Sequence, residues 1–298
     1  MATHLNNHWA RLLILFTLCT SLIVTGVAQA ESKLRVSPEE LKAQLNQAGL
    51  VIIDARSFES YAQNHIPGSV NFPEPLTYEH KSLNGQIVQP SQMQKIAREL
   101  GLAVDKQIII YDSGELMAAA RVFWSLEVYG FNNVKVLNQG FEGWIKKDYE
   151  ISQDIPKIEP STYVPVINHN RIATKLKTQI ATKSPNKVII DARPKEYYFG
   201  EKSSAKRFGH IPTALNIPAS HNLQKSNNSN VLQSTDKLKA LYADIPRDQK
   251  IVLYCAIGRI STTNYLVLRE LGYDVSNYDA SWKEWGNDFS MPIEQIKL

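Results

Sequence analysis

The five residues Ile-Ile-Asp-Ala-Arg occur twice in this chain of 298 residues, at Ile52–Arg56 and again at Ile189–Arg193. Three further segments recur in the same order: His65–Pro73 with His210–Pro218, Ile108–Asp112 with Ile251–Cys255, and Asn138–Trp144 with Asp279–Trp285. Each second copy lies about 140 residues after the first, whereas the repeats of a solenoid are only about 20 to 50 residues long. The spacing therefore indicates a duplicated domain.

Each copy alternates short apolar runs with the pattern of amphipathic helices. The runs lack polar alternation, which is typical of strands buried on both faces, and they predict strands at 51–53, 108–111, 134–137, 187–190, 251–254 and 275–278. A helix is expected from a capping box at Ser37 to Gly49, and another from its cap at Ser91 to Gly101. Strands that alternate with helices predict an α/β fold in both copies, each a mainly parallel sheet flanked by helices.

The first 30 residues have the pattern of a secretory signal peptide. Arg11 precedes an uncharged apolar run, Leu12–Val27, and Ala28-Gln29-Ala30 then supplies the small residues of a cleavage site. A retained membrane anchor is the alternative, but the run is shorter than the roughly 20 residues that span a bilayer. We expect cleavage after Ala30 and export, to the periplasm of a bacterium. The remainder divides into an N-terminal domain (31–150), a linker with three prolines (151–165) and a C-terminal domain (166–298).

The composition is that of an ordinary globular protein, with 43% hydrophobic and 21% charged residues. The chain has 33 Lys and Arg against 29 Asp and Glu, and this surplus of +4 is too small to suggest nucleic-acid binding. Of its two cysteines, Cys19 lies in the apolar run and would leave with the signal peptide. Cys255 alone cannot form an internal disulfide. We expect a monomer that is not bound to a membrane after cleavage and that holds no cofactor or metal.

Cys255 directly follows the predicted strand 251–254, at the edge of the sheet where open parallel sheets bind their ligands. The short loop Ala256–Ile260 comes next, and a helix is expected over residues 261–272. Backbone N–H groups and the positive end of a helix dipole favour a thiolate at such a junction. The alternative is that Cys255 is simply a small buried hydrophobic residue. No histidine is obviously placed to act as its base, so a cysteine-protease-like pair lacks support.

Two residues of the loop strengthen the interpretation of Cys255 as an exposed nucleophile. Gly258 allows the chain to curl tightly, so that successive amides point inward and form a nest for an anion. Arg259 adds a fixed positive charge nearby.

These segments resemble those of a tandem-domain rhodanese, a member of the thiosulfate and 3-mercaptopyruvate sulfurtransferase family. The resemblance extends from about Leu34 to Pro292 and rests on four motifs, namely Asp-Ala-Arg, Gly-His-Ile-Pro with Asn-Ile-Pro, Cys-x-x-Gly, and Asp-Ala-Ser-Trp-Lys-Glu-Trp. It implies two rhodanese-like domains, of which only the C-terminal one is catalytic. Asp112 stands where the second copy has Cys255, and because a carboxylate cannot become a persulfide, we expect the N-terminal domain to be inactive.

The resemblance also implies a two-step sulfur transfer. The Cys255 thiolate attacks the sulfane sulfur of an anionic donor such as thiosulfate, and the resulting persulfide passes that sulfur to cyanide or a thiol. Arg193 matches the substrate-binding arginine of the family, although an ion pair with Asp191 is the alternative. Substrate contacts are further expected from the loop after the cysteine, at Ala256, Ile257, Gly258, Arg259 and Ile260.

The identity of the donor is left open by two departures from the family pattern. Ala256-Ile257 matches neither the basic residues of thiosulfate-type members nor the Gly-Ser-Gly-like loop of mercaptopyruvate-type members. Tyr197 stands where mercaptopyruvate-type members tend to have a second arginine. The donor therefore stays open between the two, with thiosulfate favoured over 3-mercaptopyruvate.

Two other functions are compatible with a reactive cysteine in this kind of fold. A phosphatase or arsenate reductase requires the pattern Cys-x5-Arg, but Ser261 occupies the arginine position and Arg259 lies two residues short of it. A non-catalytic relay or binding module, which delivers persulfide sulfur to a partner protein, would use Cys255 in the same way as the enzyme. Sequence alone does not separate this second alternative from catalysis.

Overall fold

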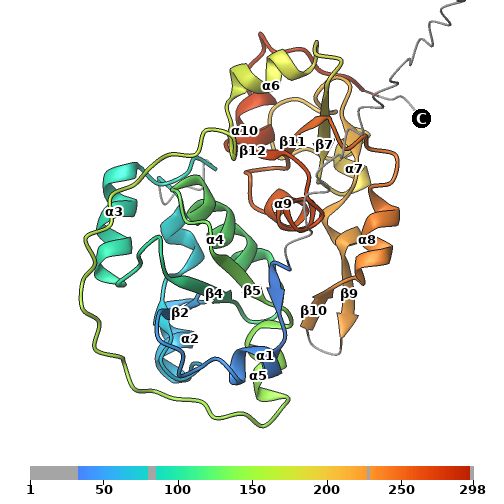
Figure 1. The fold of residues 1–298 in the computed structure, drawn as a ribbon. Coiled ribbons are helices and arrows are strands. Elements are labelled where there is room, and N and C mark those ends of the chain that lie inside the picture. Colours follow the sequence, from blue (N-terminus) through green and yellow to red (C-terminus); the bar gives the residue numbers. More distant parts are fainter. Residues whose placement is uncertain (1–32, 80–84, 227–228, 296–298) are drawn as a thin grey trace, which may run out of the picture. The chain divides into compact units, whose positions relative to one another are not determined.

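The computed structural model describes residues 33–79, 85–226 and 229–295, and the predicted signal peptide lies outside these ranges. Two five-stranded parallel sheets form the described part, each with helices on both sides (Figure 1). The prediction of two α/β domains with parallel sheets is therefore confirmed. No helix within the described ranges combines the length and apolar character needed to cross a membrane.

The N-terminal sheet has the strand order β1-β5-β4-β2-β3, and every strand pair is parallel. Along the chain its elements are β1 (Arg35–Val36), α1 (Pro38–Lys42), β2 (Leu50–Asp54), α2 (Phe58–Gln63), β3 (Val70–Asn71), the 3₁₀ helix η1 (Glu74–Thr77), α3 (Pro90–Glu99), β4 (Gln107–Tyr111), α4 (Met117–Val128), β5 (Val134–Leu137) and α5 (Gly140–Ile145).

The C-terminal sheet repeats this order as β6-β12-β11-β7-β8, as a duplicated domain should. Its elements are β6 (Ile172–Ala173), α6 (Lys175–Ala181), β7 (Lys187–Asp191), α7 (Lys195–Tyr198), β8 (Leu215–Asn216), the 3₁₀ helix η2 (Ala219–Asn222), β9 (Leu223–Ser226), β10 (Ser229–Leu232), α8 (Thr235–Leu241), β11 (Lys250–Tyr254), α9 (Ser261–Glu270), β12 (Val275–Tyr278) and α10 (Ser281–Trp285).

Both faces of each sheet are buried, which explains the continuous apolar runs in the sequence. On β4, Ile108 and Ile110 face one hydrophobic core and Ile109 faces another, because successive side chains on a strand point to opposite sides. The core on the Ile108 side also includes Leu253 of β11, so the two domains share it. The outer faces are covered separately, by α1 and α5 in the N-terminal domain and by α6 and α10 in the C-terminal domain.

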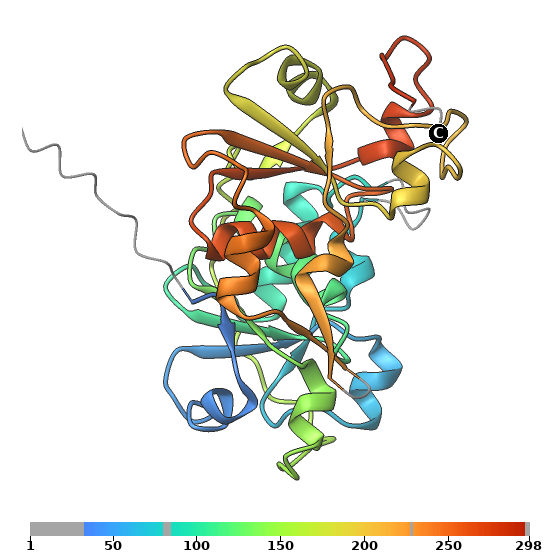
Figure 2. The same ribbon diagram turned by 90° about the vertical axis from the view of Figure 1, so that its right-hand side faces the viewer.

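Helices α4 and α9 pack against each other between the two sheets (Figures 1 and 2). Glu127 on α4 accepts hydrogen bonds from Oη of Tyr265 at 2.5 Å and from Nε and Nη2 of Arg269 at 3.0 Å each. A two-pronged arginine–carboxylate contact is both stronger and more directional than a single one. This cluster therefore fixes how the two helices are aligned, in addition to their apolar packing.

The hairpin β9–β10 extends from the C-terminal domain onto the N-terminal one (Figure 1). Asn230 N donates to the carbonyl of Gly114 at 2.7 Å, and Leu232 N donates to Oδ1 of Asn138 at 3.0 Å. The hairpin thus covers the loop that follows Asp112.

Two predicted helix boundaries are wrong. The capping box at Ser37 is present, but α1 ends at Lys42 rather than near Gly49, because the chain continues in tighter turns such as that from Gln44 N to Leu41 O. Ser91 is not the cap of α3. Proline at the preceding position has its φ already set for the first helical turn, so the helix begins at Pro90.

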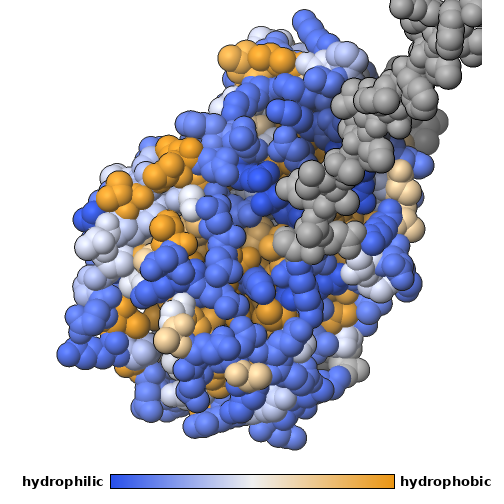
Figure 3. All heavy atoms as spheres, viewed as in Figure 1, coloured by the Kyte–Doolittle hydropathy of each residue, from blue (hydrophilic) through white to orange (hydrophobic). Residues whose placement is uncertain are grey.

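The surface in Figure 3 shows hydrophobic residues as separate small patches among hydrophilic ones. Isolated exposed apolar residues are usual on protein surfaces.

Candidate active site

Cys255 lies directly after β11, where the sequence predicts it. The parallel register pairs Tyr254 with Asp191, so β11 and β7 end side by side and the residues that follow them meet. The Cys255 side chain is 1% exposed and packs against Ala192, Ala219 and Ile260. The thiol is therefore enclosed by small and aliphatic side chains at the carboxyl edge of the sheet, and the prediction that Cys255 is exposed is wrong.

Asp191 organises the end of β7. Its carboxylate accepts hydrogen bonds from Oη of Tyr254 at 2.6 Å and from Nε and Nη2 of Arg193 at 2.9 and 2.6 Å. The Arg193 guanidinium also donates to the carbonyl of Gly209 at 2.8 Å and lies 4.4 Å from the ring centroid of Trp282. Motifs that are far apart in sequence, Asp-Ala-Arg and Asp-Ala-Ser-Trp, therefore meet at the loop that follows β11.

Arg193 forms the ion pair with Asp191 that is the alternative to substrate contact. It is 1% exposed, and its Nη1 has no hydrogen-bond partner among the described residues. The first copy repeats the pair with Arg56 and Asp54. Contact between Arg193 and a donor stays a prediction, with Nη1 as the nitrogen left for it.

The backbone at Cys255 is fixed by a serine in an unusual conformation. Cys255 N donates to Oγ of Ser281 at 3.1 Å, and this hydroxyl donates to the carbonyl of Tyr278 at 2.8 Å. Ser281 has a φ of 53°, in the left-handed region, whereas its counterpart in the first copy is Gly140 with a φ of 57°. A non-glycine residue in this region costs free energy, and such strain gathers at functional sites. The second copy therefore has a strained residue at this position, and its Ser281 hydroxyl accepts the hydrogen bond from Cys255 N.

The loop from Ala256 to Ile260 has backbone amides without a hydrogen-bond partner among the described residues. Within the described part of the chain, none of these five N–H groups donates a hydrogen bond. Gly258 has a φ of 70°, and a Cβ there would lie 2.2 Å from the carbonyl oxygen of Asp279, so a side chain does not fit. The glycine that the sequence singled out is thus needed for the tight curl, and the free amides are those that an anion-binding nest requires.

Ser261, the first residue of α9, places its hydroxyl beside the thiol. Its Oγ lies 3.4 Å from Sγ of Cys255 and 2.7 Å from Oδ1 of Asn277. Asn277 is oriented by a hydrogen bond from its Nδ2 to the carbonyl of Gly258 at 3.1 Å. Ser261 and Asn277 are both fully buried.

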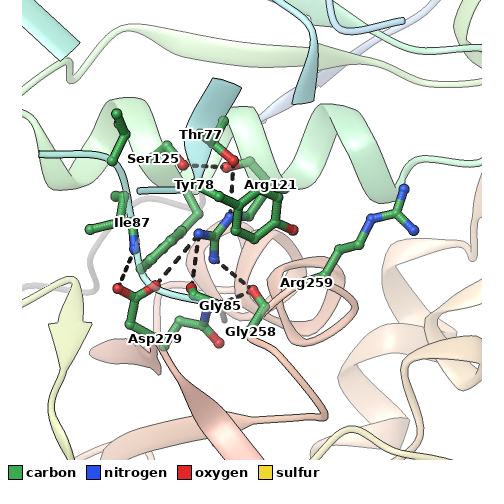
Figure 4. A network of polar contacts seen from close by, with 12 residues as sticks. Thr77, Tyr78, Gly85, Ile87, Arg121, Ser125, Gly258, Arg259 and Asp279 are labelled. Carbon is green, nitrogen blue, oxygen red and sulfur yellow. Dashed lines mark hydrogen bonds and ion pairs between the residues drawn. The ribbon is translucent and has the colours of Figure 1, made fainter. Parts of the chain in front are cut away.

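Arg121 brings the N-terminal domain into contact with the same loop (Figure 4). This α4 residue is fully buried, and its Nη1 donates to the carbonyl of Gly258 at 2.9 Å. Its guanidinium also reaches Oγ1 of Thr77 at 3.2 Å, the carbonyl of Gly85 at 3.3 Å and Oδ1 of Asp279 at 3.5 Å. Arg121, a side chain of the N-terminal domain, therefore helps to hold the tight turn of the loop that follows Cys255 in the C-terminal domain.

Asp279 is the acidic partner in this network. Oδ2 of its carboxylate accepts a hydrogen bond from Ile87 N at 2.5 Å. Burial raises the pKa of Asp279 to about 6, although Arg121 and the Ile87 amide oppose the shift. The interface between the domains thus contains a carboxyl group whose pKa lies well above the usual value of an aspartate.

Arg259 points toward the N-terminal domain. Its Nε donates to Oε1 of Glu74 at 3.1 Å, and the same oxygen accepts a hydrogen bond from Oη of Tyr78 at 2.6 Å. The Arg259 side chain lines a cavity of about 380 Å³ together with Arg56 and Asp112 of the first copy. A role for Arg259 in donor binding at Cys255 stays a prediction, as do those of the remaining loop residues.

In the first copy, Asp112 occupies its own amide cradle. The carboxylate accepts hydrogen bonds from the N–H groups of Gly114 at 2.9 Å, Leu116 at 3.2 Å and Ala119 at 3.1 Å. Burial raises the pKa of Asp112, and the three amides oppose that shift. Two amides of the first-copy loop, those of Gly114 and Leu116, are therefore paired with the Asp112 side chain, together with the amide of Ala119 on α4. No group of three or more metal-ligating side chains occurs at this or any other place in the described ranges.

Comparison with known proteins agrees with this architecture. The rhodanese-like domain family matches residues 37–147 and 173–288. The 3-mercaptopyruvate sulfurtransferase of Escherichia coli K12 is 29% identical over 281 residues, which cover 88% of this chain and 98% of that protein. A relative from Mycobacterium bovis, whose name provisionally assigns it as a thiosulfate sulfurtransferase, is 30% identical over 282 residues and 89% of this chain, or 92% of its own length.

Solved structures give the same result. The crystal structure of the E. coli 3-mercaptopyruvate sulfurtransferase SseA superposes with a TM-score of 0.75 at 28% identity, covering 84% of this chain and 99% of that one. EanB bound to ergothioneine has a TM-score of 0.79 at 19% identity over 89% of this chain and 70% of its own, a likeness of fold only.

The chain belongs to the rhodanese-like family and contains two copies of its domain. The predicted class of enzyme, a rhodanese-type sulfurtransferase, is confirmed by the relatives.

Cys255 and Gly258 were predicted to lie at this site, whereas Ser281, Asn277 and Arg121 were not. The signal for Ser281 was available, because a serine replaces the Gly140 of the first copy. Arg121 lies on α4 of the other domain and gave no such signal, since only the docking of the two domains brings it to the loop.

Proposed function

We propose that this protein transfers a sulfane sulfur from a small anionic donor to a thiophilic acceptor through a persulfide on Cys255. In the first step the Cys255 thiolate attacks the outer sulfur of thiosulfate. The bond between the two donor sulfurs breaks, sulfite leaves with the electron pair, and the outer sulfur remains on Cys255. In the second step cyanide or a thiolate attacks that outer sulfur, and the Cys255 thiolate is regenerated.

The observation that carries the proposal is the contrast between the two loops. Asp112 fills the cradle of the first copy with its own carboxylate, which accepts three amide hydrogen bonds. In the second copy the residue at that position is Cys255, and the amides of Ala256–Ile260 have no partner among the described residues. A persulfide places its negative charge on an extra atom beyond Sγ. The free amides can bind that charge as the amides of an oxyanion hole do.

Thiosulfate is the proposed donor, and 3-mercaptopyruvate is the alternative. The relatives compared above include proteins named for each of the two donors. The position of Tyr197, where a second arginine would favour the carboxylate of mercaptopyruvate, supports thiosulfate. Steady-state rates with each donor at equal concentration decide between them, and a higher kcat/KM with mercaptopyruvate would reverse the order.

The test is turnover of thiosulfate and cyanide to thiocyanate by the purified protein, combined with intact mass spectrometry. Thiosulfate alone should add one sulfur atom to the protein, and cyanide should remove it. The variant Cys255→Ala should neither gain the sulfur nor turn over, because no other residue is proposed to hold the persulfide. A rate in Cys255→Ala equal to that of the unchanged protein would overturn the proposal.

A persulfide relay to a partner protein is the second candidate. It is favoured by the 1% exposure of Cys255, because an enclosed persulfide is shielded from solution thiols. In that case thiosulfate loads Cys255 but cyanide discharges it slowly. The same mass measurement separates loading from discharge.

We also propose that the chain is exported and cleaved after Ala30, so that sulfur transfer takes place in the periplasm. The charged start, apolar run and small-residue exit of residues 1–30 support this. Intact mass of the protein recovered from the periplasmic fraction of a bacterial host tests it. A chain that keeps its first 30 residues would contradict the proposal.

A further inference from the structure

The hydroxyl of Ser261 has two acceptors and only one proton. Sγ of Cys255 lies 3.4 Å from Ser261 Oγ and Oδ1 of Asn277 lies 2.7 Å from it, and all three residues are buried. Asn277 cannot turn to offer its amino group instead, because its Nδ2 donates to the carbonyl of Gly258. The proton of the hydroxyl therefore points either to the asparagine or to the sulfur, with no movement of heavier atoms.

The charge on the sulfur decides which acceptor wins. A neutral or persulfidated Sγ is a weak acceptor, so the hydroxyl then donates to Asn277. A thiolate at Sγ is charged, and hydrogen bonds to charged groups are roughly twice as strong as neutral ones. We propose that Ser261 is a further catalytic residue, whose hydroxyl turns from Asn277 to Sγ as negative charge develops on Cys255.

This role belongs to one half of the reaction. When the acceptor attacks the outer sulfur of the persulfide, the bond between the two sulfurs breaks and its electron pair moves to Sγ. The Ser261 hydroxyl then donates to the leaving thiolate and lowers the barrier. In the loading step the thiolate is the nucleophile, and a hydrogen bond to it does not help the attack. Ser261 is thus a catalyst of discharge rather than of loading. The kinetic part of the inference rests on the proposed sulfur transfer.

Asn277 is a positioning residue in this arrangement. Its side chain connects the hydroxyl to the carbonyl of Gly258, which also accepts the hydrogen bond from Arg121. The charged groups nearest to the loop are paired with one another, as Asp191 with Arg193, Arg121 with Asp279, and Glu74 with Arg259. Removing one neutral hydroxyl leaves all of them unchanged.

The substitution Ser261→Ala removes the hydroxyl, and Thr263→Val is its matched control. Thr263 lies on the first turn of the same helix and is also fully buried, but its Oγ1 has no partner in the described part of the chain. Both variants therefore lose one buried hydroxyl, and only one of the two hydroxyls contacts the thiol.

The kinetic measurement follows the sulfur added to Cys255 by quenched intact mass spectrometry. Discharge of preformed persulfide by cyanide should slow about tenfold in Ser261→Ala, the value of a hydrogen bond to a charged group. The loading rate with thiosulfate at alkaline pH should change by no more than about threefold. Thr263→Val should match the unchanged protein in both steps. Equal losses in loading and discharge, or equal effects of the two substitutions, would overturn the proposal.

A second measurement does not depend on sulfur transfer. The rate at which iodoacetamide alkylates Cys255 is followed against pH, with digestion to peptides to separate Cys255 from Cys19. The pH at the midpoint of this curve should rise by about one unit in Ser261→Ala and stay in place in Thr263→Val. If the protein proves not to turn over thiosulfate, this shift still tests the hydrogen bond. An unmoved midpoint in Ser261→Ala would refute it.

Discussion

Replacing Arg121 with methionine tests whether the N-terminal domain holds the loop of Cys255. The guanidinium is fully buried and donates to the carbonyls of Gly258 and Gly85 and to the carboxylate of Asp279. Methionine is similar in length and apolar, so it fills the space but supplies none of these hydrogen bonds. The variant therefore isolates the polar network from the packing around it.

The loss can be estimated from what the network leaves behind. Breaking a buried ion pair by removing one partner costs about 3 to 5 kcal/mol. Here Asp279 keeps the amide of Ile87, Gly258 keeps Nδ2 of Asn277, and the Arg121–Asp279 distance of 3.5 Å is long. The lower end is therefore expected, a loss of about 3 kcal/mol in the free energy of unfolding at pH 7.5.

The assay is urea unfolding of the purified protein, with thiosulfate:cyanide turnover measured in parallel. The loss should be smaller at pH 5, because the pKa of Asp279 is about 6 and its carboxyl group is then mostly neutral. Since the carbonyl of Gly258 loses one of its two hydrogen bonds, kcat should fall as well. Lys95→Met is the control, because this side chain is 74% exposed and its pair with Glu99 is worth little.

Two results would refute the reasoning about Arg121. A loss of less than 1 kcal/mol in Arg121→Met would mean that the network contributes no more than a surface contact. A loss of the expected size, about 3 kcal/mol, with unchanged kcat would mean that Arg121 supports the fold but does not position the loop. Arg121→Lys should lie between the methionine variant and the unchanged protein, because a lysine keeps the charge but cannot reach as many acceptors.

Three further predictions follow from the same region. Gly258→Ala should reduce turnover by more than tenfold, because its Cβ would lie 2.2 Å from the carbonyl oxygen of Asp279. Gly272→Ala has open space around it and should lower the free energy of unfolding by only about 1 kcal/mol, because of its left-handed φ. An equal loss of turnover in the two variants would contradict this. The pKa of Asp279 is raised from 3.8 to about 6, so its contribution to stability is full below pH 4 and is lost as the pH rises through 6. Asp279→Asn should therefore reduce the change in unfolding free energy between pH 4 and 7 by about 2 to 3 kcal/mol. An unchanged pH dependence in urea unfolding would exclude this. Glu127→Gln and Arg269→Leu should show a coupling of about 1 to 3 kcal/mol in a double-mutant cycle, and strict additivity would mean that the α4–α9 cluster does not align the domains.

The strands and their order in the chain could be predicted because each buried strand is a continuous apolar run. Ile108–Tyr111 and Ile251–Tyr254 have that pattern, and β4 and β11 cover both segments. Helix boundaries could not be predicted in the same way, because they depend on single hydrogen bonds at the ends. At Pro90 the fixed φ of proline decided the start of α3, although Ser91 was the better cap by residue type.

The place of the nucleophile could also be predicted, because a residue after a parallel strand must lie at the ligand-binding edge of the sheet. The environment of that nucleophile could not. Asp191 pairs with Arg193, which lies only two residues further along the chain. The hydroxyl beside Cys255, in contrast, comes from Ser261 and is oriented by Asn277 on another strand. Contacts between side chains on different elements leave no periodic signal in one sequence.

The sequence by itself determined that this protein is a duplicated α/β chain in which one copy carries a cysteine and the other an aspartate. Residue type alone decides that difference, because a carboxylate cannot accept a sulfur atom and a thiolate can. Only the tertiary structure decided that the two copies pack together and share a hydrophobic core. Arg121 lies 137 residues before Gly258 and reaches its carbonyl because α4 packs on α9, a contact that no local pattern encodes. The domain without the cysteine thereby acquires a contact with the loop of the domain that has it.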